Sequence, residues 1–591
     1  MPDKIHVSIA WPYPNGEMHM GHVAGAFLPG DIFARYHRLA GNDVLMVSGS
    51  DSHGTPITVL ADAQGKTPRE VFEHYHVHFL QSLAELGISF DLFTHTDTEN
   101  HHRMAQDMFL KLLEHGYLYE AEEEQFYSEA SRRFLPDRYV EGECYLCHFP
   151  DARGDQCDNC GNLLDARQLI NPRSKVDGTA PVLRTTRHYY LDLAKLQPQL
   201  DAWLHEGKDF WRPNVLAFAR NYVAGGLHGR AFTRDLDWGI PVPLPGNEGK
   251  CIYVWFEAVM GYLSASIEWA AHRDRPDQWK DWWYAPEARI YHFIGKDNIP
   301  FHTIIWPAEL MGTRQLYDTG TRPLNLPYDV PANEFMNIEG RQFSKSRNWA
   351  VYVPDYLSRY DPDPLRYYLA AAMPETRDSD FSWHEFVRRN NDELVAAWGN
   401  LANRILTFAY KHFDGHIPEP GPLAPVDEAI LAEMDGAFAS VGALLGACKF
   451  RAALAEILAH VDAANRYIDK QAPWFQIKSD RAAAATTVYV TLRVVDSLKT
   501  LLAPFLPFTC ERLHQYLGYG GTLFGTLHTE HYAEPTRGHD ALVYDPAGAA
   551  GHWAPSALPA GQAMRPSQPL FKKLEPKVAE EETARLGQPA G

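Results

Sequence analysis

Two histidines near the start of the chain have the spacing and surroundings of a phosphate-binding site. His19 and His22 flank Gly21, between the strand-like run 5–10 and a helix-like run that opens at Val23. The first turn of a helix offers unpaired amides and a positive dipole end to anions, and a glycine lets a nucleotide approach without meeting a Cβ. The same spacing also occurs in a helix cap or in half of a metal site, so the pattern alone leaves these interpretations open.

A second basic segment lies far along the chain. Ser344, Lys345 and Ser346 form a short loop candidate, with Arg341 and Arg347 on its two sides. One lysine between two serines and flanked by arginines can close over a polyphosphate, whereas a solvated basic turn has the same composition. If both segments contribute, the sequence predicts a nucleotide site assembled from distant parts of the chain.

Four of the seven cysteines are arranged as two CxxC pairs. Cys144 and Cys147 form the first pair, and Cys157 and Cys160 form the second. Each pair directs two thiolates at one ion, so the two pairs complete a tetrahedron around zinc. A pair of disulfides is the competing interpretation, which a reducing cytoplasm disfavours. We expect one structural Zn²⁺, because four cysteines leave no open coordination position.

Together, the two basic segments resemble the HIGH and KMSKS signatures of the class I aminoacyl-tRNA synthetases. Within that class, several further stretches are similar to the methionyl-tRNA synthetase family. These stretches are residues 10–16, 49–56, 253–258, 292–297 and 471–474. They occur in the family's order and cover roughly residues 5–475.

This resemblance implies ATP-dependent activation of L-methionine and its transfer to tRNA(Met), including the initiator tRNA, with Mg²⁺ accompanying ATP. It implies that His19 and His22 bind the phosphates and that Lys345 closes over them. The ATP-binding residues implied are His19, Gly21, His22, Ser344, Lys345 and Ser346. The chain departs from the KMSKS pattern at Gln342 and Phe343, so either Arg341 compensates or Lys345 carries most of the effect.

The resemblance also implies a methionine pocket. Its residues are Ala10, Trp11, Tyr13, Asp51, Trp255, Ala258, Tyr262 and His302. Asp51 is implied to bind the substrate ammonium, and aromatic walls suit an unbranched thioether. Trp11 stands where many relatives have leucine, and Val259 where some have proline. Without the family, each aromatic residue is better explained as part of the core.

Three residues of the C-terminal half are candidates for reading an anticodon. Asn400 and Arg404 are four residues apart and so share a helix face, and Trp474 follows Pro473, which should end the preceding helix. A tryptophan at a helix end can stack an unpaired base. The resemblance assigns Asn400, Arg404 and Trp474 to the CAU anticodon, while packing within a helical bundle is the alternative for Trp474.

The patterns along the chain predict an α/β Rossmann-like nucleotide-binding domain that is split by a zinc-binding insertion and followed by an α-helical bundle. The expected parts are the catalytic domain at 1–115 and 236–325, the insertion at 116–235, the KMSKS-loop region at 326–385, the helical anticodon-binding domain at 386–535, and a poorly ordered tail with a short helix at 536–591. The tail prediction rests on its Gly-, Ala- and Pro-rich composition.

Composition limits the classes of function. The chain has 591 residues, 45% of them hydrophobic, and a formal net charge of −20, which argues against a general nucleic-acid coat protein but not against a discrete tRNA. No continuous run reaches the roughly 18 apolar residues that a membrane span needs, and the start lacks the features of a signal peptide, so we expect a cytoplasmic protein with no membrane partner. Only 20 residues follow Phe571, too few for an added dimerising domain, so we expect a monomer.

Three other functions remain open at this point. A class I synthetase for Val, Ile, Leu or Cys would share the fold, but the short insertion and residues 253–258 favour methionine. A nucleotidylyltransferase that does not act on tRNA would not need the helical bundle or Trp474. A zinc-dependent nucleic-acid-binding module would leave His22 and Lys345 unexplained.

Overall fold

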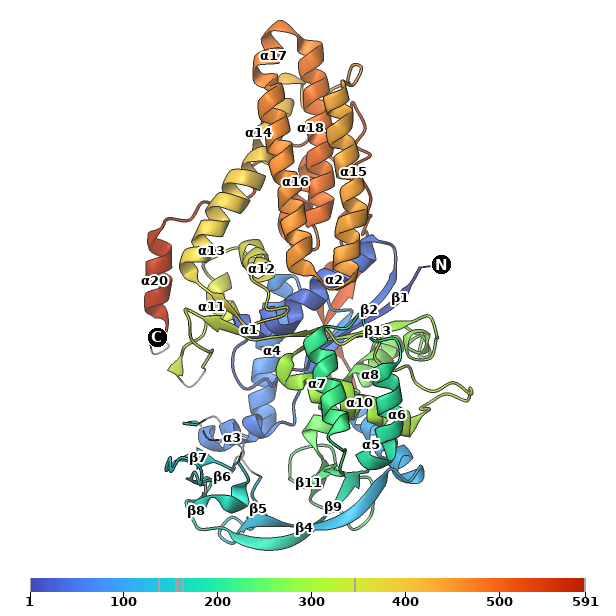
Figure 1. Cartoon of the computed structure of the whole chain (residues 1–591), viewed down its shortest axis with the longest axis vertical. Coiled ribbons are helices and arrows are strands. Elements are labelled where there is room, and N and C mark those ends of the chain that lie inside the picture. The colour runs from blue at the N-terminus through green and yellow to red at the C-terminus, as the bar shows by residue number, and fades with distance from the viewer. Residues whose placement is uncertain are drawn as a thin grey trace.

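The computed structural model describes residues 2–136, 139–154, 157, 159–160, 164–344 and 347–588. Lys345 and Ser346 therefore lie outside the described residues. The molecule is elongated, with a helical bundle at one end, an α/β domain in the middle and the cysteine-bearing insertion at the other end (Figure 1).

A seven-stranded sheet in the order β14-β13-β1-β2-β3-β18-β17 forms the centre of the α/β domain. Its strands are β1 (Lys4–Ile9), β2 (Asp43–Ser50), β3 (Leu92–His95), β13 (Arg289–Gly295), β14 (Ala332–Asn333), β17 (Thr526–Tyr532) and β18 (His539–Asp545). β1 pairs in parallel with both β2 and β13, so Ile5 lies between Val44 and Arg289. The predicted Rossmann-like sheet is confirmed, and its strand order reverses between β1 and β13.

The α/β domain also contains helices, most of which lie around this sheet (Figure 1). They are α1 (Met20–His22), η1 (Val23–Phe27), α2 (Leu28–Leu39), α3 (Thr55–Gln64), α4 (Pro68–Leu86), α5 (Glu99–Glu114), α8 (Val254–His272), α9 (Lys280–Trp283), η4 (Lys296–Asn298), η5 (Phe301–Ile305) and α10 (Trp306–Thr313). α4 shows how local sequence sets such bounds: Thr67 and Glu70 form a capping box, and Gly87 ends the helix with a φ of 70°.

The insertion separates α5 from the second half of the sheet. Its elements are β4 (Leu118–Ser128), β5 (Arg133–Phe134), β6 (Val140–Glu143), β7 (Ala152–Arg153), η3 (Ala166–Gln168), β8 (Ile170–Ser174), β9 (Val182–Leu191), α6 (Leu193–His205), α7 (Pro213–Ala224), β10 (Arg230–Ala231), β11 (Thr233–Asp235) and β12 (Lys250–Ile252). β4 and β9 pair along their lengths, and β6, β7 and β8 form a small sheet beside the cysteines. A cysteine-bearing insertion thus interrupts the nucleotide fold, as predicted.

A connecting region joins the α/β domain to the bundle. It contains β15 (Met336–Ile338), α11 (Val353–Leu357), α12 (Pro362–Ala371), β16 (Ser379–Phe381) and α13 (Trp383–Arg389). The helices that follow are η7 (Asn390–Gly399), α14 (Asn400–His412), α15 (Pro425–Gly446), α16 (Phe450–Gln471), α17 (Pro473–Ser479), α18 (Arg481–Leu502) and α19 (Pro507–Tyr516). The predicted helical bundle is therefore present.

One helix of the bundle differs from the expectation about membrane spans. By length and composition alone, α15 is apolar enough to cross a membrane, and 39% of that stretch is buried. It packs against α16 and α18, as the core helix of a bundle does.

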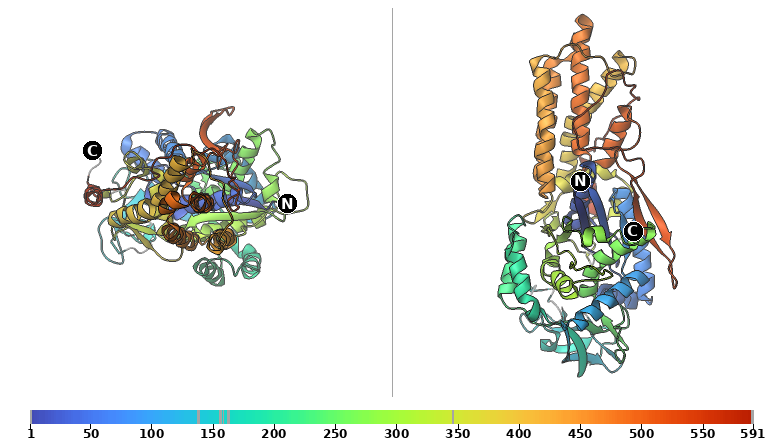
Figure 2. Two further views of the ribbon diagram at one scale, coloured as in Figure 1. Left: turned by 90° about the horizontal axis from the view of Figure 1, so that it is seen from above. Right: turned by 90° about the vertical axis from the view of Figure 1, so that its right-hand side faces the viewer.

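The expected poorly ordered tail is wrong for part of its length. β17 and β18 form an antiparallel hairpin that joins the central sheet through β3, and the expected boundary at residue 535 cuts through its turn. Figure 2 shows this orange-red hairpin beside the catalytic domain. The partner strand β3 is far from β18 in the sequence, so local periodicity could not predict that the two strands pair. The expected short helix is α20 (Lys577–Arg585), which packs on α13.

Candidate active site

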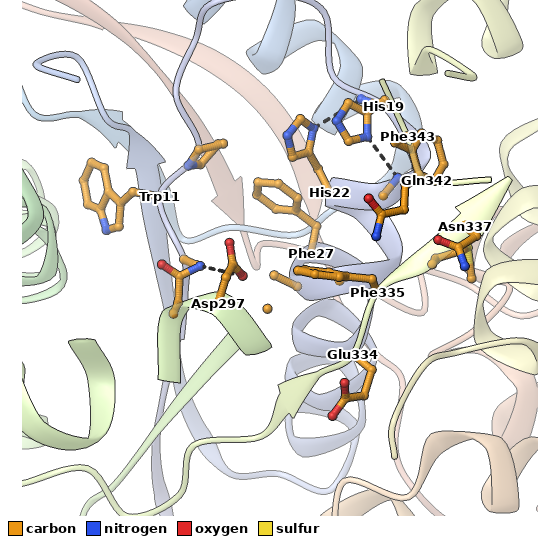
Figure 3. Close-up of a pocket in the computed structure, with 18 residues that line it drawn as sticks. Trp11, His19, His22, Phe27, Asp297, Glu334, Phe335, Asn337, Gln342 and Phe343 are labelled. Atoms are coloured by element: carbon orange, nitrogen blue, oxygen red, sulfur yellow. Dashed lines mark hydrogen bonds between the residues drawn. The ribbon is translucent and has the colours of Figure 1, made fainter. Parts of the chain in front are cut away.

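A cavity of about 370 Å³ opens where the strand order of the sheet reverses. Residues 10–12 follow β1 and residues 295–298 continue from the end of β13, and both segments line it. Ligands of open α/β sheets bind at this kind of crevice, beyond the carboxyl ends of the strands. Figure 3 shows His19, His22 and Phe343 grouped on one side of the cavity, with Asp297 and Glu334 away from them.

The two histidines are held at the first turn of the helix by their own backbone. The Gly21 amide donates to His19 Nδ1 at 3.2 Å, and the His19 amide donates to His22 Nδ1 at 3.3 Å. Since both Nδ1 atoms accept, each neutral imidazole carries its proton on Nε2. The rings stack with centroids 3.7 Å apart. A Cβ on Gly21 would lie 3.0 Å from the His19 ring, which explains the glycine.

The predicted KMSKS-like segment reaches the same cavity. Phe343 stacks on His19 with centroids 5.0 Å apart, and Gln342 lines the cavity. Ser344 pairs with Trp349 through two backbone hydrogen bonds of 3.0 and 2.9 Å. The Arg341 guanidinium lies 4.6 Å from the centre of the Trp349 ring. The described residues Gln342 and Phe343 of this segment therefore lie at the edge of the cavity.

Trp11 fills a slot between the sheet and α8. A Cβ on Gly49 would lie 2.2 Å from its ring, and a Cβ on Gly261 would lie 2.7 Å from it. Both glycines are thus needed to leave room for this large side chain. Its indole N–H is buried and has no acceptor among the described residues.

Tyr262 and His302 form a buried hydrogen-bonded pair beside Trp11. His302 Nδ1 donates to the Asn298 carbonyl at 3.0 Å, so its Nε2 accepts the Tyr262 hydroxyl at 2.6 Å. Burial lowers the pKa of His302 to about 4, which keeps the ring neutral at pH 7. The Tyr262 ring lies 6.3 Å from that of Trp11, centroid to centroid.

Asp51 lies at the end of β2, next to the segment that follows β1. Its amide donates to the Pro12 carbonyl at 2.9 Å, and its carboxylate accepts the His53 amide at 3.2 Å. Burial and the nearby Glu257 carboxylate raise the pKa of Asp51 well above its usual range, while the charge of His53 opposes this. A bound ammonium would favour the ionised form in the same way.

The remaining predicted pocket residues surround the same region. Ala10 lines the cavity, and Ala258 lies half-buried on α8. The rings of Tyr13 and Trp255 meet edge to face with centroids 6.3 Å apart. Tyr13 packs over Gly54, where a Cβ would lie 2.0 Å from its ring.

Comparisons with known proteins agree with this geometry. The family model described as tRNA synthetases class I (M) matches residues 5–406, and the model described as the anticodon binding domain of methionyl tRNA ligase matches residues 417–546. The methionine-tRNA ligase of Thermomicrobium roseum is 57% identical, and that of Roseiflexus castenholzii 54%, with 99% of each chain covered. The chain belongs to the methionine-tRNA ligase family.

A solved structure supports the same assignment. Mycobacterium tuberculosis methionyl-tRNA synthetase bound by methionyl-adenylate is 26% identical, with a TM-score of 0.74 over 96% of this chain and 100% of that one. This ligase therefore activates methionine with ATP and charges tRNA as a class I aminoacyl-tRNA synthetase.

The four predicted zinc ligands of the ligase come together in the insertion. Their sulfurs lie within 4.8 Å of one another, with Cys144 and Cys160 separated by 4.0 Å and Cys147 and Cys157 by 3.5 Å. A tetrahedral site with Zn–S bonds of about 2.3 Å places its sulfurs about 3.8 Å apart. None of these four cysteines forms a disulfide in the structure, so the disulfide alternative is not what it shows. The cluster fits a zinc ion.

The candidate anticodon residues lie in the part of the bundle far from the cavity (Figure 1). α16 ends before Ala472, whose φ is 45°, and α17 begins at Pro473, as predicted. The Arg404 guanidinium lies 4.4 Å from the centre of the Trp474 ring and 3.0 Å from Asp469. Asn400 is exposed at the first turn of α14. The structure thus joins Arg404 to Trp474 directly and places Asn400 one turn away.

Sequence reasoning missed a buried charged network behind Asp51. His53 Nδ1 lies 2.8 Å from one oxygen of Glu257, and His101 Nε2 lies 2.7 Å from the other. Burial opposes the charge of His53, but Glu257 and Asp97 outweigh it and raise its pKa to about 10. His53 and Glu257 both lie in stretches quoted for the resemblance, so polar residues within apolar surroundings were the available signal.

Proposed function

We propose that the cavity at the sheet reversal holds the ATP phosphates and that the ligase uses His19 and His22 as hydrogen-bond donors to them. The observation that carries this proposal is the protonation pattern: both Nδ1 atoms are acceptors for backbone amides, so the Nε2–H groups are the donors. Two preorganised donors at a helix N-terminus stabilise an anion without reorganising.

Activation then proceeds by attack of the methionine carboxylate on the α-phosphorus of ATP. A bond forms between the carboxylate oxygen and phosphorus, the bond from phosphorus to the bridging oxygen breaks, and pyrophosphate leaves. Mg²⁺ bound with ATP would neutralise part of the phosphate charge. Negative charge increases on the phosphate oxygens, so cationic and N–H donors act more strongly in the transition state than before it. Lys345, two residues after Phe343 in the chain, supplies the charge in this proposal, and Gly21, Ser344 and Ser346 complete the site.

Methionine binds between the cavity and α8 in this proposal. Asp51 receives the ammonium, which leaves the carboxylate facing the ATP cavity. Trp11, Tyr13, Trp255 and Tyr262 supply aromatic contacts for the thioether, with Ala10 and Ala258 leaving room. The neutral His302 holds the Tyr262 hydroxyl in place. A branched side chain would meet these rings, and a shorter one would leave a gap.

The terminal ribose hydroxyl of tRNA(Met), including the initiator tRNA, next attacks the methionyl carbonyl of the adenylate. An ester bond forms, the bond from the carbonyl carbon to the phosphate oxygen breaks, and AMP leaves as the hydroxyl gives up its proton. We assign recognition of the CAU anticodon to Asn400, Arg404 and Trp474, because an indole beside a guanidinium can stack a base and donate to its edge. The four-cysteine cluster binds one structural Zn²⁺. We also propose that the ligase acts as a monomer in the cytoplasm.

The test is ATP–pyrophosphate exchange with each amino acid in turn. Methionine alone should support rapid exchange, and His19→Asn and His22→Asn should each lower its rate without weakening methionine binding. Exchange supported equally well by valine or cysteine would contradict the pocket assignment. Unchanged exchange in both histidine variants would contradict the proposed donors.

A further inference from the structure

The turn of the C-terminal hairpin docks on the loop that follows β3. Glu534 accepts the amides of Glu99 and Asn100 at 3.0 and 3.3 Å, at the N-terminus of α5. In return, Glu99 accepts the Thr536 amide at 2.6 Å. These reciprocal bonds hold residues 533–538 against the start of α5, although the hairpin follows the whole helical bundle in sequence.

Arg537 extends from this turn into the charged network behind the methionine pocket. One of its terminal nitrogens donates to both the Asp97 carboxylate, at 2.6 Å, and the Asp97 carbonyl, at 2.8 Å. Arg69 contacts the same carboxylate at 3.0 Å. The two bonds from Arg537 restrain both the backbone and the side chain of Asp97.

Asp97 in turn faces His53. Its other carboxylate oxygen lies 3.6 Å from His53 Nε2 and 3.3 Å from His102 Nε2. Burial opposes ionisation of Asp97, but the hydrogen bonds from these two rings hold its pKa below the usual range. The three side chains are close enough to share a metal ion. The two guanidinium groups on Asp97 already supply the balancing positive charge, so the contacts describe an ion-pair network.

The network ends at the carboxylate assigned to the substrate ammonium. His53 carries its charge between Glu257 and Asp97, and its amide donates to Asp51. Burial and Glu257 raise the pKa of Asp51, and the charge of His53 opposes this shift, so it favours the ionised carboxylate that binds an ammonium. The orientation of His53 therefore matters for the affinity of the pocket.

We propose that Arg537 is a positioning residue for methionine binding, acting through Asp97 and His53 on the carboxylate that receives the substrate ammonium. The inference rests on the proposed role of Asp51. It makes the hairpin, which the chain reaches only after the bundle, part of the amino-acid site. Arg537 touches no substrate, so its effect should appear in methionine affinity and not in the attack on ATP.

The experiment measures pyrophosphate exchange of the full chain while methionine and ATP are varied separately. Arg537→Gln should raise the KM for methionine about three- to tenfold and leave the KM for ATP and kcat within about twofold. Arg537→Lys should restore most of the affinity, since one ammonium can reach both Asp97 acceptors. Arg273→Gln is the matched control, because Arg273 holds the same hairpin through the Tyr544 carbonyl at 3.1 Å.

Two results would overturn the inference. One is an unchanged KM for methionine in Arg537→Gln. The other is a parallel rise of both KM values with a lower thermal midpoint, in Arg273→Gln as well, which would mean that the arginines only pack the hairpin. Asp51→Asn separates the two proposals. If it weakens methionine binding and Arg537→Gln does not, only the role of Arg537 fails; if Asp51→Asn has no effect, the ammonium site itself is wrong.

Discussion

At the scale of single residues, the active site depends on where each proton sits. Nδ1 of His19 and of His22 accepts a hydrogen bond from a backbone amide, whereas Nδ1 of His302 donates one to the Asn298 carbonyl. Identical side chains are thereby given opposite roles: the first two present Nε2–H donors, while the third presents an acceptor to Tyr262. The local backbone determines this division before any substrate arrives.

The residue most sensitive to the developing phosphate charge should be Lys345. Lys345→Ala should slow methionyl-adenylate formation by about 10²–10³-fold and leave the affinity for methionine nearly unchanged. Gln342→Ala should be far milder, because a neutral amide contributes no charge. Pyrophosphate exchange at saturating and limiting methionine distinguishes the two. Equal effects of the two substitutions would contradict the assignment of the charge to Lys345.

At the scale of elements, the insertion carries the cysteine cluster, and the helical bundle carries the candidate anticodon residues. The small sheet of β6, β7 and β8 is short, and the cysteine cluster lies beside it. Elements this small bury too little apolar surface to be stable alone, so a bound metal would contribute much of their folding energy.

Removing one cysteine ligand should therefore unfold a region and not the whole molecule. Cys157→Ala should lower the zinc content below one ion per chain and expose the insertion to proteolysis, while the bundle keeps its helical signal. Elemental analysis and limited proteolysis measure both effects. Cys251→Ala, at a buried cysteine outside the cluster, is the control and should retain zinc. Wild-type protein purified without zinc and equally resistant to protease would contradict the prediction.

The tip of the bundle should affect only the tRNA-dependent step. Trp474→Ala removes a stacking surface worth about 1–3 kcal/mol, so kcat/KM for tRNA charging should fall roughly ten- to hundredfold. Methionine activation without tRNA should not change, since α17 lies outside the nucleotide fold. Aminoacylation and pyrophosphate exchange are compared on the same preparations. Equal loss of both activities, or of neither, would mean that the tryptophan packs the bundle and reads no base.

At the scale of the whole molecule, one buried arginine joins three parts of the chain. Arg366 on α12 contacts Asp31 of α2 at 2.6 Å and donates to the Phe505 and Leu86 carbonyls, both at 3.1 Å. Both members of the ion pair are fully buried. Burial opposes ionisation of Asp31, but Arg35 and Arg366 outweigh it and lower its pKa to about 2.

Removing the Arg366 contacts should destabilise both the catalytic core and its packing against the bundle. Arg366→Met leaves buried acceptors unpaired and should cost about 3–5 kcal/mol. In the wild type, Asp31 contributes stability that is fully present above its unfolded pKa and is lost as pH falls toward 2. In the variant, loss of the Arg366 charge should raise the folded pKa of Asp31 toward the unfolded value, so the free energy of unfolding should depend less on pH over this range. Thermal unfolding at several pH values measures both. Arg388→Met, at an exposed ion pair with Glu385, is the control and should cost under about 1 kcal/mol; an equal cost for both would contradict the prediction.

The sequence by itself determined the features that local spacing encodes. The run that begins at Ile5 predicted a strand, the two CxxC pairs predicted their own cluster, and Pro473 predicted the end of the preceding helix. The resemblance to the family predicted the fold class and the reaction, because it depends on short stretches of residues and on their order along the chain. These features depend on a few neighbouring residues, so their signal survives without any knowledge of tertiary contacts.

Only the tertiary structure decided which distant segments meet. The pairing of β18 with β3 turned a predicted tail into a strand of the catalytic sheet, and it brought Arg537 to Asp97. The network around His53 likewise joins the segment after β2 to α5 and α8 through side chains that are far apart in sequence. Burial strengthens such contacts, but whether a residue is buried depends on all the elements that pack around it. A pattern of neighbouring residues therefore cannot reveal them.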